Sequence, residues 1–186
     1  SPWGPCSPEI PPPKPRAQTH RAIRMAHSPP RPTTVFVLTV SDTRTEADDK
    51  SGALCQRLVA AAGHTVGGYA IVPDEPVQIA ARCVALCDAG EVDAILLNGG
   101  TGISARDTTA SAIEGILERR LDGFGELFRM LSFAEIGSKA MASRAIAGVR
   151  KKTVIFAMPG SEKAVKLALE RLIVPELGHL CGELHK

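Results

Sequence analysis

Short apolar runs alternate with stretches of helical periodicity through residues 33–182 of this chain. Val35–Val40 is a mostly β-branched run of the kind found in strands that are buried on both faces of a sheet. A helical pattern follows from about Asp49 to Gly63, and the order of strand and helix then repeats along the chain. Strands that alternate with helices in this way are typical of parallel sheets, so the pattern predicts an α/β fold.

The same patterns give approximate bounds for the other elements. The last two expected strands are joined by very few residues, whereas a parallel crossover needs about a dozen or more, so these two form an antiparallel hairpin. We therefore expect a three-layer α/β/α sandwich with a mostly parallel sheet and one antiparallel strand. The further strands are expected at 65–72, 93–97, 144–149 and 153–158, and the further helices at 76–88, from the loop at 98–109 to about 119, at 124–133, at 138–142, and from 162 onward with an interruption at Pro175.

The first 32 residues differ sharply in composition from the rest. They hold ten of the fourteen prolines and five basic residues against one acidic residue, which leaves a slightly acidic remainder. A segment this rich in proline forms neither helices nor strand ladders, so we interpret 1–32 as a disordered leader and 33–186 as one domain. The leader lacks the apolar stretch of a secretory signal, and Met25 is a candidate natural start.

Composition excludes several classes of protein. No apolar run is long enough to span a membrane, and a formal charge of +2 is too small to indicate a nucleic-acid partner. The five cysteines are an odd number in a chain with a full-sized core, which argues against a disulfide framework and for a reducing cytoplasm. Cys83 and Cys87 share one face of an expected helix, and we interpret them as buried apolar residues rather than as metal ligands.

In open α/β sheets, ligands bind beyond the carboxyl ends of the strands. The loop Gly99-Gly100-Thr101-Gly102 holds three glycines within four positions. Glycines permit positive φ angles and a close approach of the backbone, so that amide groups can converge on an anion. This loop is either a phosphate cradle or a plain tight turn, because it is neither a Walker loop nor a dinucleotide-binding fingerprint. The stretches expected at this edge are Ser41-Asp42, Val72-Pro73-Asp74, Gly99-Gly100-Thr101-Gly102 with Arg106-Asp107, and Pro159-Gly160-Ser161.

Each polar residue at this edge also has a structural interpretation. Arg106 and Asp107 together can grip a phosphate and hold Mg²⁺, or Asp107 can simply cap the following helix while Arg106 lies in solvent. Asp74 can serve a metal or form its own turn. Taken together on one rim, two carboxylates and a phosphate cradle predict metal-assisted chemistry on a phosphorylated ligand.

The order of these residues resembles a known family. Gly99–Gly102 followed by Arg106, Asp107 and Thr109 is similar to the signature of molybdopterin-binding domains, which occur in molybdopterin adenylyltransferases and in molybdenum cofactor biosynthesis protein B (the MogA/MoaB family). The resemblance extends over about residues 33–182, and the Leu127–Phe133 stretch is closest to the B-type branch. Further matching stretches are 39–45, 71–74, 123–129, 143–145 and 158–161.

The resemblance implies a function in molybdenum cofactor biosynthesis. In the family, the terminal phosphate of molybdopterin attacks the α-phosphate of MgATP, which gives adenylyl-molybdopterin and pyrophosphate. By position, Asp74 and Asp107 match the acidic residues that the family uses to bind Mg²⁺ and to assist adenylyl transfer. Members of the family are typically trimers and often hexamers in the B-type branch, so the resemblance implies a homotrimer or homohexamer. The matching binding positions are Ser41, Asp42, Gly99, Gly100, Thr101, Gly102, Arg106, Thr109, Pro159, Gly160 and Ser161.

Three departures from the family pattern leave more than one function open. Thr109-Ala110-Ser111 replaces the usual Thr-Pro-Glu, Asn98 replaces a usual Thr, and Glu162 adds a negative charge beside an expected anion site. One hypothesis is an adenylyltransferase, which the retention of Asp74 and Asp107 favours. Another is a non-catalytic pterin-binding or assembly protein, which the missing Glu favours, and a third is a different phosphate-binding α/β protein.

Overall fold

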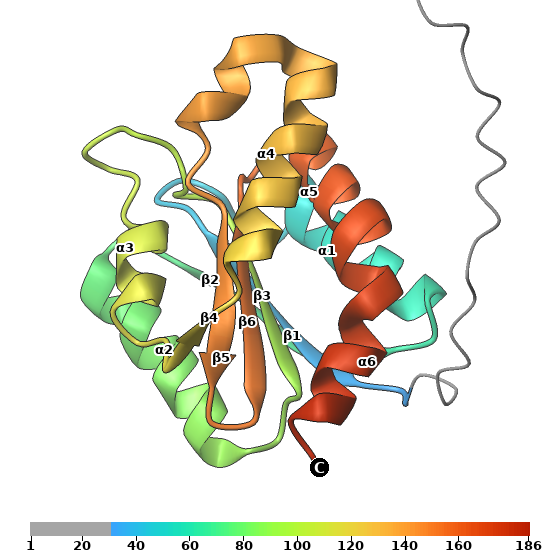
Figure 1. The fold of residues 1–186 in the computed structure, drawn as a ribbon. Helices are drawn as coiled ribbons and strands as arrows, with labels where there is room; N and C mark the ends of the chain where they lie inside the picture. Colours follow the sequence, from blue (N-terminus) through green and yellow to red (C-terminus); the bar gives the residue numbers. More distant parts are fainter. Residues whose placement is uncertain (1–30) are drawn as a thin grey trace, which may run out of the picture.

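A six-stranded mixed sheet forms the centre of the described chain (Figure 1). The structure is a computed structural model that describes residues 31–186, so residues 1–30 of the expected leader lie outside the described residues. The strand order is β2-β1-β3-β6-β5-β4, in which β5 alone runs opposite to the other five strands. This topology confirms the expected fold class. The strands are β1 (Thr34–Val40), β2 (Thr65–Val72), β3 (Ala94–Asn98), β4 (Arg119–Arg120), β5 (Ile146–Arg150) and β6 (Thr153–Met158).

Helices cover both faces of the sheet, which makes the three expected layers (Figure 1). One face carries α1, α4, α5 and α6, and the other carries α2 and α3. The helices are α1 (Lys50–Ala61), α2 (Pro76–Ala89), α3 (Thr109–Glu114), α4 (Asp122–Ile136), the 3₁₀ helix η1 (Gly137–Ala142), α5 (Glu162–Ala168), the π-helical turn η2 (Leu169–Ile173) and α6 (Val174–Glu183).

The central strands are buried on both faces, as the unbroken apolar runs predict. In β1, Val35 and Val37 join the core beneath α1 and the C-terminal helices, while Phe36 and Leu38 join the core beneath α2 and α3. Successive side chains of a strand point to opposite faces, so a single apolar run supplies both cores. This burial fixes the register of the sheet and therefore the position of the loops at its carboxyl edge.

Two of the expected elements are wrong. The helix expected to reach about Arg119 ends at Glu114, because Gly115 closes it, and Arg119–Arg120 instead pairs with β5 as a short edge strand. Pro175 does not interrupt the C-terminal helix, which continues into α6 through the wider η2 turn. A wider turn can accommodate a residue that lacks a backbone N–H and whose ring crowds the preceding turn.

The cysteines of the described chain behave as core residues. Cys55, Cys83, Cys87 and Cys181 are free and buried, which confirms the expected burial of Cys83 and Cys87. Burial raises the pKa of the Cys55, Cys83 and Cys181 thiols to about 12. Within residues 31–186, no three His, Cys, Asp or Glu side chains gather closely enough to hold a metal ion by themselves. No helix in that range is both long and apolar enough to cross a membrane.

Candidate active site

The four predicted stretches meet at the carboxyl edge of the sheet. The chain leaves β1 toward α1 on one face and leaves the adjacent β3 toward α3 on the other face, and in open α/β sheets ligands commonly bind at such a switch point. Backbone contacts tie the loops together. The amide of Ser41 donates to the Val72 carbonyl at 2.9 Å, and the amide of Gly99 donates to the Met158 carbonyl at 3.0 Å.

The glycine loop adopts a backbone that side chains would disturb. Gly99 has φ +109° and Gly100 has φ +62°, both in the left-handed region that favours glycine. A Cβ on Gly99 would lie 2.2 Å from the Val40 carbonyl oxygen, and a Cβ on Gly100 would lie 2.4 Å from the Asp74 carboxylate. The glycines therefore let the loop run directly against β1 and against Asp74.

Asp74 links its own loop to the start of α3. Its Oδ1 accepts hydrogen bonds from the Thr108 amide at 3.0 Å and from the Thr108 hydroxyl at 2.6 Å, and the residue is 9% exposed. The alternative that Asp74 only forms its own turn is therefore wrong. Within the described chain its recorded side-chain hydrogen bonds all involve Oδ1, while Oδ2 faces Gly100.

Asp107 lies at the other end of the glycine loop. Its carboxylate accepts a hydrogen bond from the Ser104 amide at 2.9 Å, and a Cβ on Gly102 would lie 2.7 Å from its Oδ2. The N-cap residue of α3 is Thr108, so the alternative in which Asp107 caps this helix is wrong. Asp74 and Asp107 thus flank the same four-residue loop, one beside Gly100 and one beside Gly102.

Two threonines of the loop region carry buried hydroxyl groups. Thr101 is 2% exposed and Thr109 is 0% exposed, and neither hydroxyl oxygen has a hydrogen-bond partner among the described residues. A Cβ on Gly100 would lie 2.3 Å from the Thr109 oxygen. Buried polar groups are usually hydrogen-bonded, so these two hydroxyls mark a loop whose polar groups are not all satisfied by the protein itself.

Arg106 is paired with acidic side chains of the same rim. Its guanidinium contacts the Asp42 carboxylate and lies 3.7 Å from Glu75. A hydrogen bond from Arg106, together with one from the Asp74 amide at 3.0 Å, lowers the pKa of Asp42. Asp42 therefore connects the loop after β1 to both neighbouring loops, while phosphate binding by Arg106 stays a prediction.

The Pro159-Gly160-Ser161 turn packs against the glycine loop. A Cβ on Gly160 would lie 3.1 Å from the Gly99 Cα, so the absence of a side chain permits this approach. The Ser161 hydroxyl caps α5 by accepting a hydrogen bond from the Ala164 amide at 3.2 Å, and Glu162 is exposed in the first turn. The turn thus contributes backbone to the rim, with Ser161 at its outer edge.

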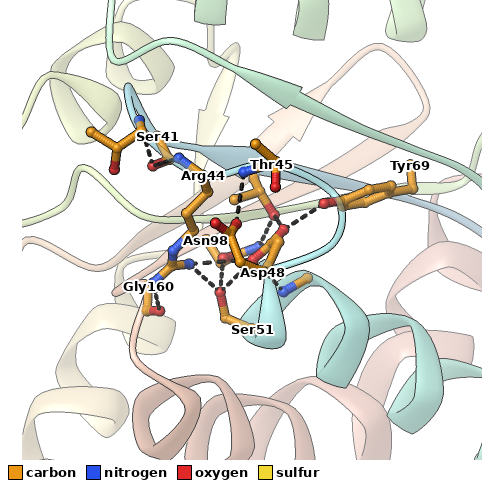
Figure 2. A network of polar contacts seen from close by, with 12 residues as sticks. Ser41, Arg44, Thr45, Asp48, Ser51, Tyr69, Asn98 and Gly160 are labelled. Carbon is orange, nitrogen blue, oxygen red and sulfur yellow. Dashed lines mark hydrogen bonds and ion pairs between the residues drawn. The ribbon is translucent and has the colours of Figure 1, made fainter.

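A buried carboxylate beneath the rim was missed by the sequence analysis. Asp49 is 2% exposed and caps α1 through a 3.0 Å hydrogen bond from the Gly52 amide. It also accepts hydrogen bonds from the Thr39 hydroxyl at 2.5 Å and the Tyr69 hydroxyl at 2.6 Å, and the Ser51 hydroxyl lies 3.0 Å away (Figure 2). Burial pushes the pKa of Asp49 upward, but these hydrogen bonds outweigh burial and hold its pKa below the ordinary value.

Asn98 and Arg44 extend this network to the surface of the site. The Asn98 amide donates to Thr39 at 2.9 Å and accepts from Ser51 at 2.7 Å, which joins the residue before the glycine loop to β1 and α1. Arg44 donates to Ser51 at 2.5 Å and to the Gly160 carbonyl at 3.1 Å (Figure 2). We define the Asp49 network as Thr39, Arg44, Asp49, Ser51, Tyr69 and Asn98.

Comparison with known proteins agrees with this arrangement of loops. A family model described as "Probable molybdopterin binding domain" matches residues 36–179. The chain belongs to the molybdopterin-binding domain family. Within the family it stands in the branch of molybdenum cofactor biosynthesis protein B, also called MoaB.

Relatives in this branch cover most of the chain. Molybdenum cofactor biosynthesis protein B of Halalkalibacterium halodurans is 53% identical over 158 residues, which are 84% of this chain and 93% of the relative. A crystal structure of molybdenum cofactor biosynthesis protein B matches with a TM-score of 0.82 at 49% identity, over 85% of this chain and 99% of the other. The molybdopterin biosynthesis enzyme MoaB of Thermus thermophilus matches with a TM-score of 0.74 at 36% identity, over 82% and 96% of the two chains.

Proposed function

We propose that the protein binds molybdopterin and ATP and adenylylates molybdopterin. In the proposed reaction, an oxygen of the terminal phosphate of molybdopterin forms a bond to the α-phosphorus of ATP. The bond between that phosphorus and the oxygen bridging to the β-phosphate breaks, so that adenylyl-molybdopterin and pyrophosphate are the products. The observation that carries this proposal is the placement of Asp74 and Asp107 against two glycines of one loop.

The residues present fit a magnesium ion that is shared with phosphates. Asp74 presents Oδ2 toward the loop, and Asp107 lies at the loop's other end, which gives two carboxylates but no complete protein cage within the described chain. Mg²⁺ commonly takes one or two carboxylates and completes its shell with water and substrate phosphates. When bound, Mg²⁺ would offset the repulsion between two anionic substrates and the charge of the departing pyrophosphate.

The protein's own groups have positioning roles in this proposal. Gly99 and Gly100 let the loop run directly against Val40 and Asp74, and in this proposal the backbone amides that follow Gly99 face a phosphate. The Thr101 and Thr109 hydroxyls of the same loop region have no hydrogen-bond partner in the described chain. The family relationship supports molybdopterin as the ligand and molybdenum cofactor biosynthesis as the process. It also supports a homo-oligomer as the active form.

The missing acid at position 111 favoured a non-catalytic alternative, and its surroundings weaken that argument. Ser111 accepts a hydrogen bond from Arg144 at 2.7 Å, on the part of α3 beyond the glycine loop. The recorded contacts of Ser111 therefore involve neither Asp74 nor Asp107. The two-carboxylate arrangement at the glycine loop is therefore in place without an acid at position 111.

The direct test mixes the full chain with molybdopterin and MgATP and measures adenylyl-molybdopterin and pyrophosphate. Asp107→Asn keeps the shape and the acceptor for Ser104 but removes the negative charge. We expect adenylyl transfer to fall by about a hundredfold or more, the scale for losing one strong electrostatic contact in a transition state. Molybdopterin affinity should change little, because the loop backbone is retained, and Asp74→Asn should behave in the same way.

The outcomes separate the two hypotheses. An active wild type whose Asp107→Asn variant turns over normally removes Asp107 from the mechanism. Weaker pterin binding with unaltered turnover per bound ligand assigns Asp107 to ligand capture instead. A wild type that binds molybdopterin but forms no adenylylated product supports the non-catalytic alternative.

A further inference from the structure

Arg44 belongs to the loop after β1, and its side chain reaches Gly160 of the Pro159–Ser161 turn (Figure 2). Its Nη1 donates to Ser51 Oγ at 2.5 Å and to Asp49 Oδ1 at 3.3 Å, and its Nη2 donates to the Gly160 carbonyl at 3.1 Å. A guanidinium has five N–H donors, and these contacts use three of them. Within the described chain, the Nε hydrogen and the second Nη2 hydrogen have no recorded acceptor, so Arg44 retains unused donors at the rim.

The charge of Arg44 is exposed while the charge of its acidic partner is not. The Arg44 side chain is 35% exposed, whereas the Asp49 side chain is 0% exposed and is already bound by Thr39, Tyr69 and the Gly52 amide. The contact between Arg44 and Asp49 is also the longest of those that Asp49 makes. An anion that approaches the rim therefore meets the guanidinium rather than the carboxylate.

Arg106 presents the opposite situation. Its two acidic partners are themselves exposed at the surface, Asp42 to 37% and Glu75 to 49%. An anion that approaches Arg106 meets two exposed carboxylates beside the cation, and their repulsion opposes binding. By this comparison, Arg44 offers the more favourable positive charge on the rim.

Arg44 is also close to the glycine loop. A Cβ built on Gly160 would lie 3.8 Å from Arg44 Nη1 and 3.1 Å from the Gly99 Cα. Gly160, which has no side chain, therefore lies close to both the guanidinium and the loop. A phosphate on the amides of the glycine loop therefore has a cation with free N–H donors next to it.

We propose that Arg44 binds a phosphate of the substrates, the role that the sequence pattern assigns to Arg106. The proposal rests on the proposed function, because it takes its ligands from that reaction. The chemical class is a phosphate oxyanion, which either MgATP or the terminal phosphate of molybdopterin can supply. The guanidinium fork supplies both charge and paired donors, whereas a lysine supplies charge alone.

The test measures the binding of MgATP and of molybdopterin separately, by calorimetric titration of the full chain. Arg44→Gln should weaken binding of one ligand by about tenfold or more, the scale of lost charge-assisted hydrogen bonds. Arg44→Lys should recover part of the loss, and Arg106→Gln should cost less than Arg44→Gln. Arg57→Gln removes one exposed charge on α1 outside the site and serves as the matched control.

A salt series distinguishes ligand contact from a structural role. If Arg44 contacts the ligand, the affinity of the wild type falls with added salt more steeply than that of Arg44→Gln. If Arg44→Gln loses affinity for MgATP alone, Arg44 contacts the nucleotide phosphates. If it loses affinity for molybdopterin alone, Arg44 contacts the pterin phosphate.

Two results overturn the proposal. One is an Arg44→Gln variant that binds both ligands as the wild type does. The other is an Arg44→Gln variant whose affinity is weaker but whose dependence on salt equals that of the wild type. A wild type that binds both ligands but does not turn over refutes the proposed reaction while leaving the Arg44 test valid.

Discussion

Asp49→Ala tests whether the buried network beneath the rim stabilises the domain. The substitution removes the cap of α1 and the acceptor of the Thr39 and Tyr69 hydroxyls. An N-cap contributes about 1 kcal/mol, and each buried polar group left without a partner costs about 1–3 kcal/mol. Thr39 is 0% exposed and cannot rehydrate, while the half-buried Tyr69 can do so in part. We therefore expect a loss of roughly 3–5 kcal/mol in the free energy of unfolding.

Asp49→Asn should cost less, because an amide keeps one acceptor and hydroxyl groups can accept as well as donate. We expect about 1–2 kcal/mol for this variant, most of it from the lost charge. The assay is urea unfolding followed by circular dichroism at one fixed protein concentration, since an oligomer's stability depends on concentration. Asp48→Ala is the matched control, because the Asp48 carboxylate is exposed and accepts a hydrogen bond from the Thr45 amide at the surface.

The pH dependence of this difference gives a second check. The folded pKa of Asp49 lies below the unfolded value of about 3.9, so its stabilisation is present above that value and is lost as the pH falls through the folded pKa. The gap in stability between the wild type and Asp49→Asn should be constant above about pH 5 and should narrow below about pH 4. A loss below about 1 kcal/mol in Asp49→Ala, or a gap that widens on acidification, would refute the reasoning.

Two further substitutions follow from the glycine loop and from α4. Gly100→Ala places a Cβ 2.4 Å from Asp74 at φ +62°, so we expect a loss of roughly 1–3 kcal/mol in the free energy of unfolding and weaker pterin binding. Gly115→Ala, whose nearest contact is 3.6 Å, is the tolerated control in the same unfolding and titration assays. Apolar side chains on α4 are exposed, among them Met130 at 59% and Phe133 at 61%, and we predict that they form a contact between copies. Light scattering should then give the wild type a mass well above the 19.6 kDa of one chain, and should give Phe133→Glu a lower mass. A wild type that scatters as a single chain contradicts the second expectation.

The fold was predictable because its signals are local. The run at Val35–Val40 and the run at Thr153–Met158 are apolar regardless of what surrounds them, and the short link after β5 permits only a hairpin. The edge strand Arg119–Arg120 has two residues, too few to show any period, and its pairing depends on β5, which lies far along the chain. The turn at Leu169–Ile173 depends on packing, because Leu169 and Ile173 are both fully buried in the core.

Asp74 and Asp107 could be placed on the rim because each directly follows a recognisable strand or glycine loop. The Asp49 network could not be assembled in this way, since Thr39, Tyr69 and Asn98 lie on three different strands. One local signal was available. Asp49 stands immediately before the helix that begins at Lys50, where aspartate is a favoured capping residue, and an N-cap between a strand and a helix lies near the carboxyl edge of the sheet.

The substitution at Asn98 shows how the network tolerates a departure from the family pattern. Asn98 is 0% exposed, so its amide must find partners within the protein. It reaches Thr39 with its nitrogen and Ser51 with its oxygen, and Ser51 in turn contacts Arg44. A threonine at this position has a shorter side chain with one polar atom in place of two, so both contacts would depend on a single hydroxyl oxygen. Asn98 therefore links the start of the glycine loop, through Ser51, to the cation that we assign to phosphate binding.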